Sequence, residues 1–182
     1  IVIGEGITSI DDFTFRGCSN LTSVSLPSTL TRIGGHAFNR CQGLTTVNFP
    51  ENLIQIGTSA FANCSSLQNV KLPNSLRVVG NHAFEATAIK TIEIPSSIIT
   101  IPQSVFEDCY YLETVTIPNS VRGIEVCAFK DCSGIRSIIY KGTKEEWARI
   151  SISSYGNDAL ESATIKTLSS STKVTLAKTT LR

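Results

Sequence analysis

The sequence contains no methionine, one tryptophan and two histidines, and it carries almost no net charge. Its 16 basic and 15 acidic side chains leave a formal charge of +1, so we expect no strongly basic surface for nucleic acid or an anionic membrane. Its apolar runs are only a few residues long, whereas a membrane-spanning helix needs roughly 20 apolar residues. The sequence therefore argues against nucleic-acid binding and against membrane insertion.

Short motifs that mark common enzyme sites are also missing. No G-x-S-x-G, G-x-x-x-x-G-K or H-E-x-x-H string occurs. No charged N-terminal region leads into an apolar stretch and a cleavage site, so no signal peptide is visible. We expect no catalytic activity and no cofactor, although a pocket with convergent ionisable groups would favour an enzyme.

One apolar pattern recurs along most of the chain. It consists of an aliphatic residue, a second aliphatic residue three positions later, and an apolar residue two positions after that. Its copies begin 23 residues apart, except for one step of 22, at Leu21, Leu44, Leu67, Ile89, Leu112 and Ile135. Such self-similarity is the sequence signature of a solenoid, in which stacked units share one core.

Further residues recur at fixed distances after most copies of the pattern. Five copies are closed by a proline: Pro27, Pro50, Pro73, Pro95 and Pro118. A small or aliphatic residue and a phenylalanine follow at 37–38, 60–61, 83–84, 105–106 and 128–129, and a cysteine comes three positions later in four of these units. The 22-residue step lies near Thr87, which takes the cysteine position, and we interpret it as a tolerated loop variant.

Alternating apolar residues within each copy predict a strand with one buried face. Proline ends such a strand because it cannot donate a ladder hydrogen bond. We expect the central residues of successive copies to stack in register in one parallel sheet: Val24, Val47, Val70, Ile92, Val115 and Ile138. A short return strand and a helical turn around each Ala-Phe pair should complete the unit, and Ile1 and Ile3 match the end of an incomplete strand, which suggests a natural N-terminus upstream.

The pattern Pro-x-x-Leu-x-x-Ile-Gly-x-x-Ala-Phe-x-x-Cys-x-x-Leu-x-x-Ile resembles the BspA-like (Treponema pallidum type) leucine-rich repeats. The resemblance implies an α/β, β-rich solenoid: a right-handed horseshoe with one parallel sheet, short return strands, short helical turns and a C-terminal cap. Residues 1–140 would be repeats, 141–168 the cap, and 169–182 a tail, linker or added strand. The family also implies extracellular or cell-surface proteins that attach to host or matrix proteins and have no enzyme activity.

The cysteines require a choice between free thiols, disulfides and a metal site. Cys18, Cys41, Cys64, Cys109 and Cys132 recur with the repeat, so we expect each at an equivalent buried position as a free thiol. Side chains stacked along a solenoid run parallel, which favours neither bridging nor tetrahedral zinc binding. Cys127 occupies a different repeat position and is expected to be exposed.

The two histidines, His36 and His82, share one repeat position but lie two units apart, about 10 Å. They are too far apart to bind one metal ion without a third ligand, and spacing holds no carboxylate beside either of them. Trp147 follows three charged residues on an expected amphipathic helix. It would cover the open end of the core or, alternatively, anchor a partner.

The strongest candidate for function is the outward side of the main strands, which we call the strand face. Its residues are mostly hydroxyl and amide side chains: Ser23, Ser25, Thr46, Asn48, Asn69, Lys71, Thr91, Glu93, Thr114, Thr116 and Ser137. Solenoids commonly bind proteins on such extended surfaces, although these residues could serve only to keep the sheet soluble. A structural spacer that projects other domains is therefore the alternative function. Self-association through the open N-terminal edge is a further expectation.

Overall fold

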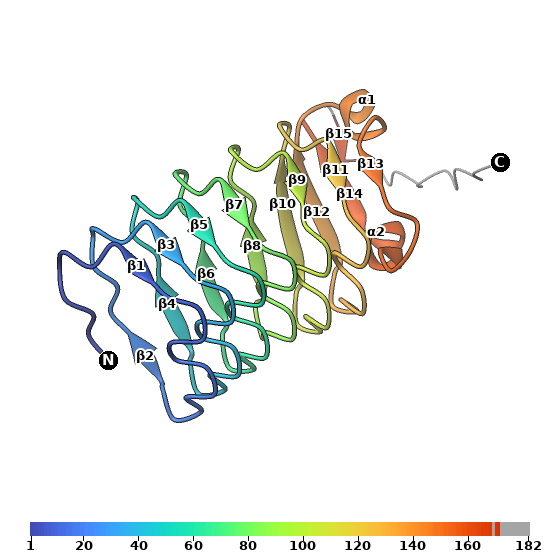
Figure 1. Cartoon of the computed structure of the whole chain (residues 1–182). Helices are drawn as coiled ribbons and strands as arrows, with labels where there is room; N and C mark the ends of the chain where they lie inside the picture. The colour runs from blue at the N-terminus through green and yellow to red at the C-terminus, as the bar shows by residue number, and fades with distance from the viewer. Residues whose placement is uncertain (169, 172–182) are drawn as a thin grey trace.

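The computed structural model describes residues 1–168 and 170–171, which form a coil of short strands stacked in two rows (Figure 1). The front row comprises β2 (Ser23–Val24), β4 (Thr46–Asn48), β6 (Asn69–Lys71), β8 (Thr91–Glu93), β10 (Thr114–Pro118), β12 (Ser137–Lys141) and β14 (Thr164–Thr167). The return row comprises β1 (Ser9–Ile10), β3 (Arg32–Ile33), β5 (Gln55–Ile56), β7 (Val78–Val79), β9 (Thr100–Ile101), β11 (Gly123–Ile124) and β13 (Ser151–Ile152). The expected parallel-strand solenoid is confirmed.

The predicted register of the front row is confirmed within two groups of strands. Val47 pairs with Val24 and Val70, and Val115 pairs with Ile92 and Ile138. Before β2, Val2 forms a single parallel bridge with Ser25, so residues 1–3 lie beside this strand as the repeat predicts.

The prediction of one continuous front sheet is wrong. The front row consists of β2-β4-β6 and, separately, β15-β14-β12-β10-β8, so no ladder joins the neighbouring strands β6 and β8 within residues 1–168. Glu113 donates its N–H to the carbonyl of Lys90, but Lys90 makes no corresponding bond to Gln68. The interruption coincides with the 22-residue step, where the loop before Ile89 is one residue short. That step is therefore more than a loop variant.

The return row is interrupted at the same unit, between β7 and β9. In three preceding units, a glycine after the return strand donates its N–H to the previous unit, as Gly80 does to Ile56 at 2.9 Å. Pro102 occupies this position in the unit after the interruption and has no N–H to donate. Val70 and Val79 are only half-buried at the interruption, whereas their equivalents in the neighbouring units are buried.

A third row, made of the turn segments that follow the return strands, continues across this interruption. The phenylalanine N–H of each unit donates to the following unit in the pairs Phe15–Ala37, Phe38–Ala60, Phe61–Ala83, Phe84–Val105 and Phe106–Ala128. The rings stack in the same order, with centroids 5.1 Å apart for Phe38 and Phe61 and 5.9 Å apart for Phe84 and Phe106. The turn row therefore holds the two halves of the front and return rows together.

The expected helical turns around the Ala-Phe pairs are not found. These segments are hydrogen-bonded turns in which two residues per unit adopt left-handed backbone conformations, such as His36 at φ 54° and Arg40 at φ 62°. Such residues interrupt a right-handed helix. The helices of the described residues are α1 (Lys144–Trp147) and α2 (Asp158–Ser162), both after the repeats, and neither is long enough to cross a membrane.

Residues 141–168 continue the coil by one further turn. β13 pairs with β11 in the return row, and β14 pairs with β12 in the front row. The helix α1, which lies between β12 and β13 in the chain, places Trp147 against Tyr140, with ring centroids 5.3 Å apart, and the tryptophan is 1% exposed. β15 (Ser170–Ser171) pairs antiparallel with β14, and the remainder of the expected tail, linker or added strand at 169–182 lies outside the described residues.

Candidate protein-binding surface

The eleven residues of the strand face lie on the outward side of the front row, as predicted. Eight are exposed, and Thr114, Thr116 and Ser137 are half-buried. Ladder pairing aligns them in order: Ser23 with Thr46 and Asn69, and Thr91 with Thr114 and Ser137. The structure therefore brings these residues together as two aligned groups, separated by the interruption between β6 and β8.

A groove of about 340 Å³ lies at that interruption. Its lining combines the charged side chains of Lys71, Glu93 and Lys141 with the apolar residues Val70 and Ile94. Lys141 forms an ion pair with Glu93, from two strands away in the front row. Lys141 could not be identified from the sequence, because 48 residues separate it from Glu93 and only the ladder pairing brings the two side chains together.

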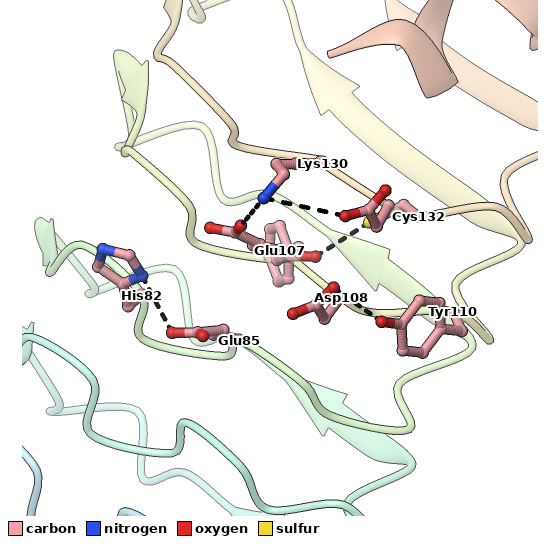
Figure 2. A network of polar contacts seen from close by, with 9 residues as sticks. His82, Glu85, Glu107, Asp108, Tyr110, Lys130 and Cys132 are labelled. Carbon is pink, nitrogen blue, oxygen red and sulfur yellow. Dashed lines mark hydrogen bonds and ion pairs between the residues drawn. The ribbon is translucent and has the colours of Figure 1, made fainter. Parts of the chain in front are cut away.

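A polar network lies on the turn row (Figure 2). Lys130 Nζ lies 2.6 Å from Glu107 Oε1 and 3.9 Å from Asp131 Oδ2. Partial burial acts to raise the pKa of Glu107, but hydrogen bonds from Lys130 and Ser104 together lower that pKa below its ordinary value. The same contact with Glu107 raises the pKa of Lys130. Both groups are therefore charged at neutral pH and hold adjacent units together.

The expectation that neither histidine has a nearby carboxylate is wrong for His82. Its Nδ1 lies 3.0 Å from Oε2 of Glu85, because the left-handed backbone at His82 (φ 58°) turns the two side chains toward each other (Figure 2). His36, by contrast, stacks on Phe13 with ring centroids 4.9 Å apart. Within the described residues, no group of three His, Cys, Asp or Glu side chains could hold a metal ion.

Four of the five repeat cysteines are buried, as predicted, and all six thiols are free. Each of the four donates its thiol to the phenylalanine carbonyl of the preceding unit: Cys41 to Phe15, Cys64 to Phe38, Cys109 to Phe84 and Cys132 to Phe106. Burial raises the pKa of Cys41 to about 11 and that of Cys64 to about 12. These thiols are therefore neutral structural groups at neutral pH.

Two expectations about individual cysteines are wrong. Cys18 is exposed, because it lies at the uncovered end of the stack beside Ile1 and Gly17. Cys127 is buried, because the loop after β13 covers it: its N–H donates to the carbonyl of Tyr155, and a Cβ on Gly156 would lie 2.7 Å from its sulfur atom. The repeat position alone did not reveal this coverage.

These features define a solenoid of parallel strands with a polar, exposed strand face. The chain belongs to the BspA-type leucine-rich-repeat family, whose model matches in six copies over residues 1–113, 33–157 and 99–180. Membership of such a family is consistent with a protein-binding repeat module, and leucine-rich-repeat families are typically non-enzymatic. No curated relative matches the sequence.

Solved structures support the fold. The T. pallidum leucine-rich repeat protein is 24% identical, with a TM-score of 0.65 and coverage of 74% of this chain and 77% of that one. A leucine-rich repeat protein from Eubacterium ventriosum is 21% identical (TM-score 0.60; 86% and 44% covered), and one from Bacteroides ovatus is 20% identical (TM-score 0.55; 89% and 64% covered). The chain thus spans less than two thirds of the latter two proteins.

Proposed function

We propose that this chain is a non-enzymatic protein-binding module that contacts its partner through the strand face. The observation that carries the proposal is the alignment of exposed hydroxyl and amide side chains along successive strands, such as Ser23, Thr46 and Asn69. These groups can donate and accept hydrogen bonds over an extended surface, which is how solenoids commonly recognise proteins.

The proposal extends to the setting of the molecule. The family resemblance supports a secreted or cell-surface, adhesin-like protein whose partners are host or matrix proteins. The groove at the interruption, whose lining includes Val70 and Lys71, is a recess in the strand face. Such a recess supports a binding role, because a surface that serves only for solubility requires no groove. A spacer that projects other domains is the competing function.

Two arginines introduced on the strand face test the proposal. Thr46→Arg with Thr91→Arg changes exposed residues on β4 and β8 and should weaken binding to a matrix protein by about tenfold or more, because bulky cations block the surface. Thr58→Arg with Thr100→Arg, exposed on the turn and return rows, is the matched control. Surface plasmon resonance against a panel of extracellular-matrix proteins provides the measurement. A chain that binds no member of the panel, or that binds equally after both changes, would favour the spacer.

We also propose that residues 141–168 cap the stack. Trp147 and Asn157 are buried there, and Asn157 bonds the last turn segment of the repeats. At the other end, Val2 is 82% exposed, and self-association of the chain through this edge is a secondary proposal. Light scattering over a range of protein concentrations measures it, and a strictly monomeric chain would disprove it.

A further inference from the structure

Two adjacent tyrosines protrude from the surface in one unit only. Tyr110 is 55% exposed and Tyr111 is 62% exposed, although the repeat places small or polar residues between the cysteine and the next aliphatic residue. The equivalent pairs in the other full-length units are Ser19–Asn20, Gln42–Gly43, Ser65–Ser66 and Ser133–Gly134. Two large aromatic side chains at this position therefore depart from the repeat without contributing to its core.

The neighbouring loops leave these rings uncovered. On one side the shortened unit offers only Ala88 at this point. On the other side lies Gly134, where an added Cβ would be 2.5 Å from the carbonyl oxygen of Tyr110. Neither Ala88 nor Gly134 has a large side chain that could cover the rings, which agrees with the exposure of both tyrosines.

The position of Tyr110 is fixed by hydrogen bonds. Its hydroxyl donates to Oδ1 of Asp108 at 2.9 Å, and its N–H donates to the carbonyl of the same residue at 3.0 Å (Figure 2). The bond to Asp108 raises the pKa of Tyr110, so the hydroxyl is neutral at neutral pH. Rigid aromatic side chains lose little conformational entropy on binding, and tyrosine is enriched among residues that dominate interface energies.

Carboxylates outnumber cations in the polar network beside Tyr110. Glu107, Asp108 and Asp131 bring three carboxylates to the network, against the single ammonium group of Lys130, which bonds Glu107 and lies 3.9 Å from Asp131. Asp108 makes no ion pair within the described residues, and its side chain keeps one oxygen beyond the bond to Tyr110. The surface beside Tyr110 therefore complements positive charge.

We propose that Tyr110, Tyr111 and the carboxylates of Asp108 and Asp131 form a second contact surface, which binds an arginine-rich segment of a partner protein. A guanidinium group stacks on aromatic rings and donates to carboxylates at the same time, which a lysine ammonium does less well. The molecule contains one such contact already, with the guanidinium of Arg16 5.6 Å from the ring centroid of Phe13. This surface goes beyond the strand face and does not depend on it.

Peptide probes test the surface on the whole chain. A fluorescein-labelled peptide of alternating arginine and serine should bind in fluorescence anisotropy, and the lysine–serine version should bind more weakly. Tyr110→Ser with Tyr111→Ser, which copies Ser65–Ser66, should raise the Kd by about tenfold. Asp108→Asn should raise it by a smaller factor, and Tyr155→Ser, which alters another exposed tyrosine, should leave it unchanged.

Several results would overturn the proposal. They are absence of binding by the arginine peptide, equal binding of the arginine and lysine peptides, and unchanged binding after the tyrosine substitutions in a protein whose circular dichroism and melting are normal. Capture of a neutral polysaccharide that depends on both tyrosines, without peptide binding, would identify a carbohydrate site instead. The strand-face variant Thr46→Arg with Thr91→Arg should retain peptide binding, so failure of the strand-face proposal and failure of this one are distinguishable.

Discussion

Oδ1 of Asn157 accepts a hydrogen bond from the backbone N–H of Phe129 at 3.1 Å. In the repeats, the corresponding phenylalanine N–H donates to a backbone carbonyl of the following unit, as Phe106 does to Ala128. The amide nitrogen of Asn157 also donates to the carbonyls of Glu125 and Ser153, both at 3.0 Å. One buried side chain thus replaces the contact that another repeat would provide.

Asn157→Ala should lower the free energy of unfolding by about 1–3 kcal/mol, because it leaves the buried N–H of Phe129 without its partner. Urea denaturation followed by circular dichroism measures the change. Asn119→Ala, at an exposed position, is the control and should have little effect. Equal stability of the two variants would contradict the role assigned to Asn157 in the cap.

Gly57→Ala should be destabilising for a different reason. A Cβ at this position would lie 2.5 Å from the backbone nitrogen of Gly35 and 2.6 Å from the carbonyl carbon of Gly34, and neither atom can move without shifting the adjacent unit. Overpacking of this kind costs about 1–3 kcal/mol. Gly4→Ala meets no atom within 4 Å and is the matched control in thermal melting. The close approach of adjacent units would be doubtful if both variants melted together.

Alkaline pH should destabilise the chain through its buried thiols. An exposed thiol ionises near pH 8.5, whereas burial raises the pKa of Cys64 in the folded chain to about 12. The unfolded chain therefore releases this proton first, so the contribution of Cys64 is fully present below about pH 8.5 and is lost as the pH rises toward 12. Cys41 and Cys109, whose pKa values burial raises to about 11, act in the same direction.

Cys64→Thr isolates this contribution. Thr87 occupies the equivalent position and donates its hydroxyl to the carbonyl of Phe84 at 2.9 Å, so the repeat accommodates threonine there. We expect the free energy of unfolding, measured by urea denaturation at pH 7 to 10, to fall less steeply with pH in the variant than in the unmodified chain. Parallel pH profiles would rule out Cys64 as a source of the alkaline sensitivity.

The sequence predicted the features that recur with the repeat. The pairing of Val47 with Val70 and the burial of Cys64 follow from spacing, because every unit places the same residue types at the same point of the coil. Contacts between residues that do not occupy equivalent repeat positions could not be predicted from the spacing. Cys127 is covered by Gly156, and Lys141 reaches Glu93 across 48 residues, so each depends on the stacking itself.

The sequence contains the cause of the interruption in the front and return rows but does not reveal its structural consequence. The missing residue before Ile89 and the Pro102 that replaces a glycine can both be read from the repeat alignment. The loss of strand pairing could not be predicted, because it depends on which backbone N–H groups bond to the preceding unit. It also depends on whether the hydrogen bonds of the turn row continue past the shortened unit. The hydrogen bond from the N–H of Phe84 to the carbonyl of Val105 shows that the turn row continues.

Hydrogen exchange should reveal the interruption in solution. The N–H groups of Glu113 and Arg122 donate to the preceding unit, at Lys90 and Ile99 respectively. The equivalent N–H groups one unit earlier, those of Lys90 and Ile99 themselves, make no such bond within the described residues. Amides without an intramolecular partner exchange through smaller local openings. We therefore expect Lys90 and Ile99 to exchange faster than Glu113 and Arg122.

Two internal comparisons make the exchange experiment decisive, with rates measured by NMR on the whole chain. Phe84 and Phe106 both donate to the following unit in the turn row, so their amides should be protected to a similar degree on the two sides of the interruption. Fast exchange at Phe84 as well would mean that the whole shortened unit opens. Equal protection of Lys90 and Glu113, and of Ile99 and Arg122, would mean that the front and return rows are continuous. Fast exchange at Lys90 and Ile99, together with protection of Phe84 and Phe106, is the one result that agrees with the structure. It would mean that the front and return rows are interrupted while the turn row is continuous.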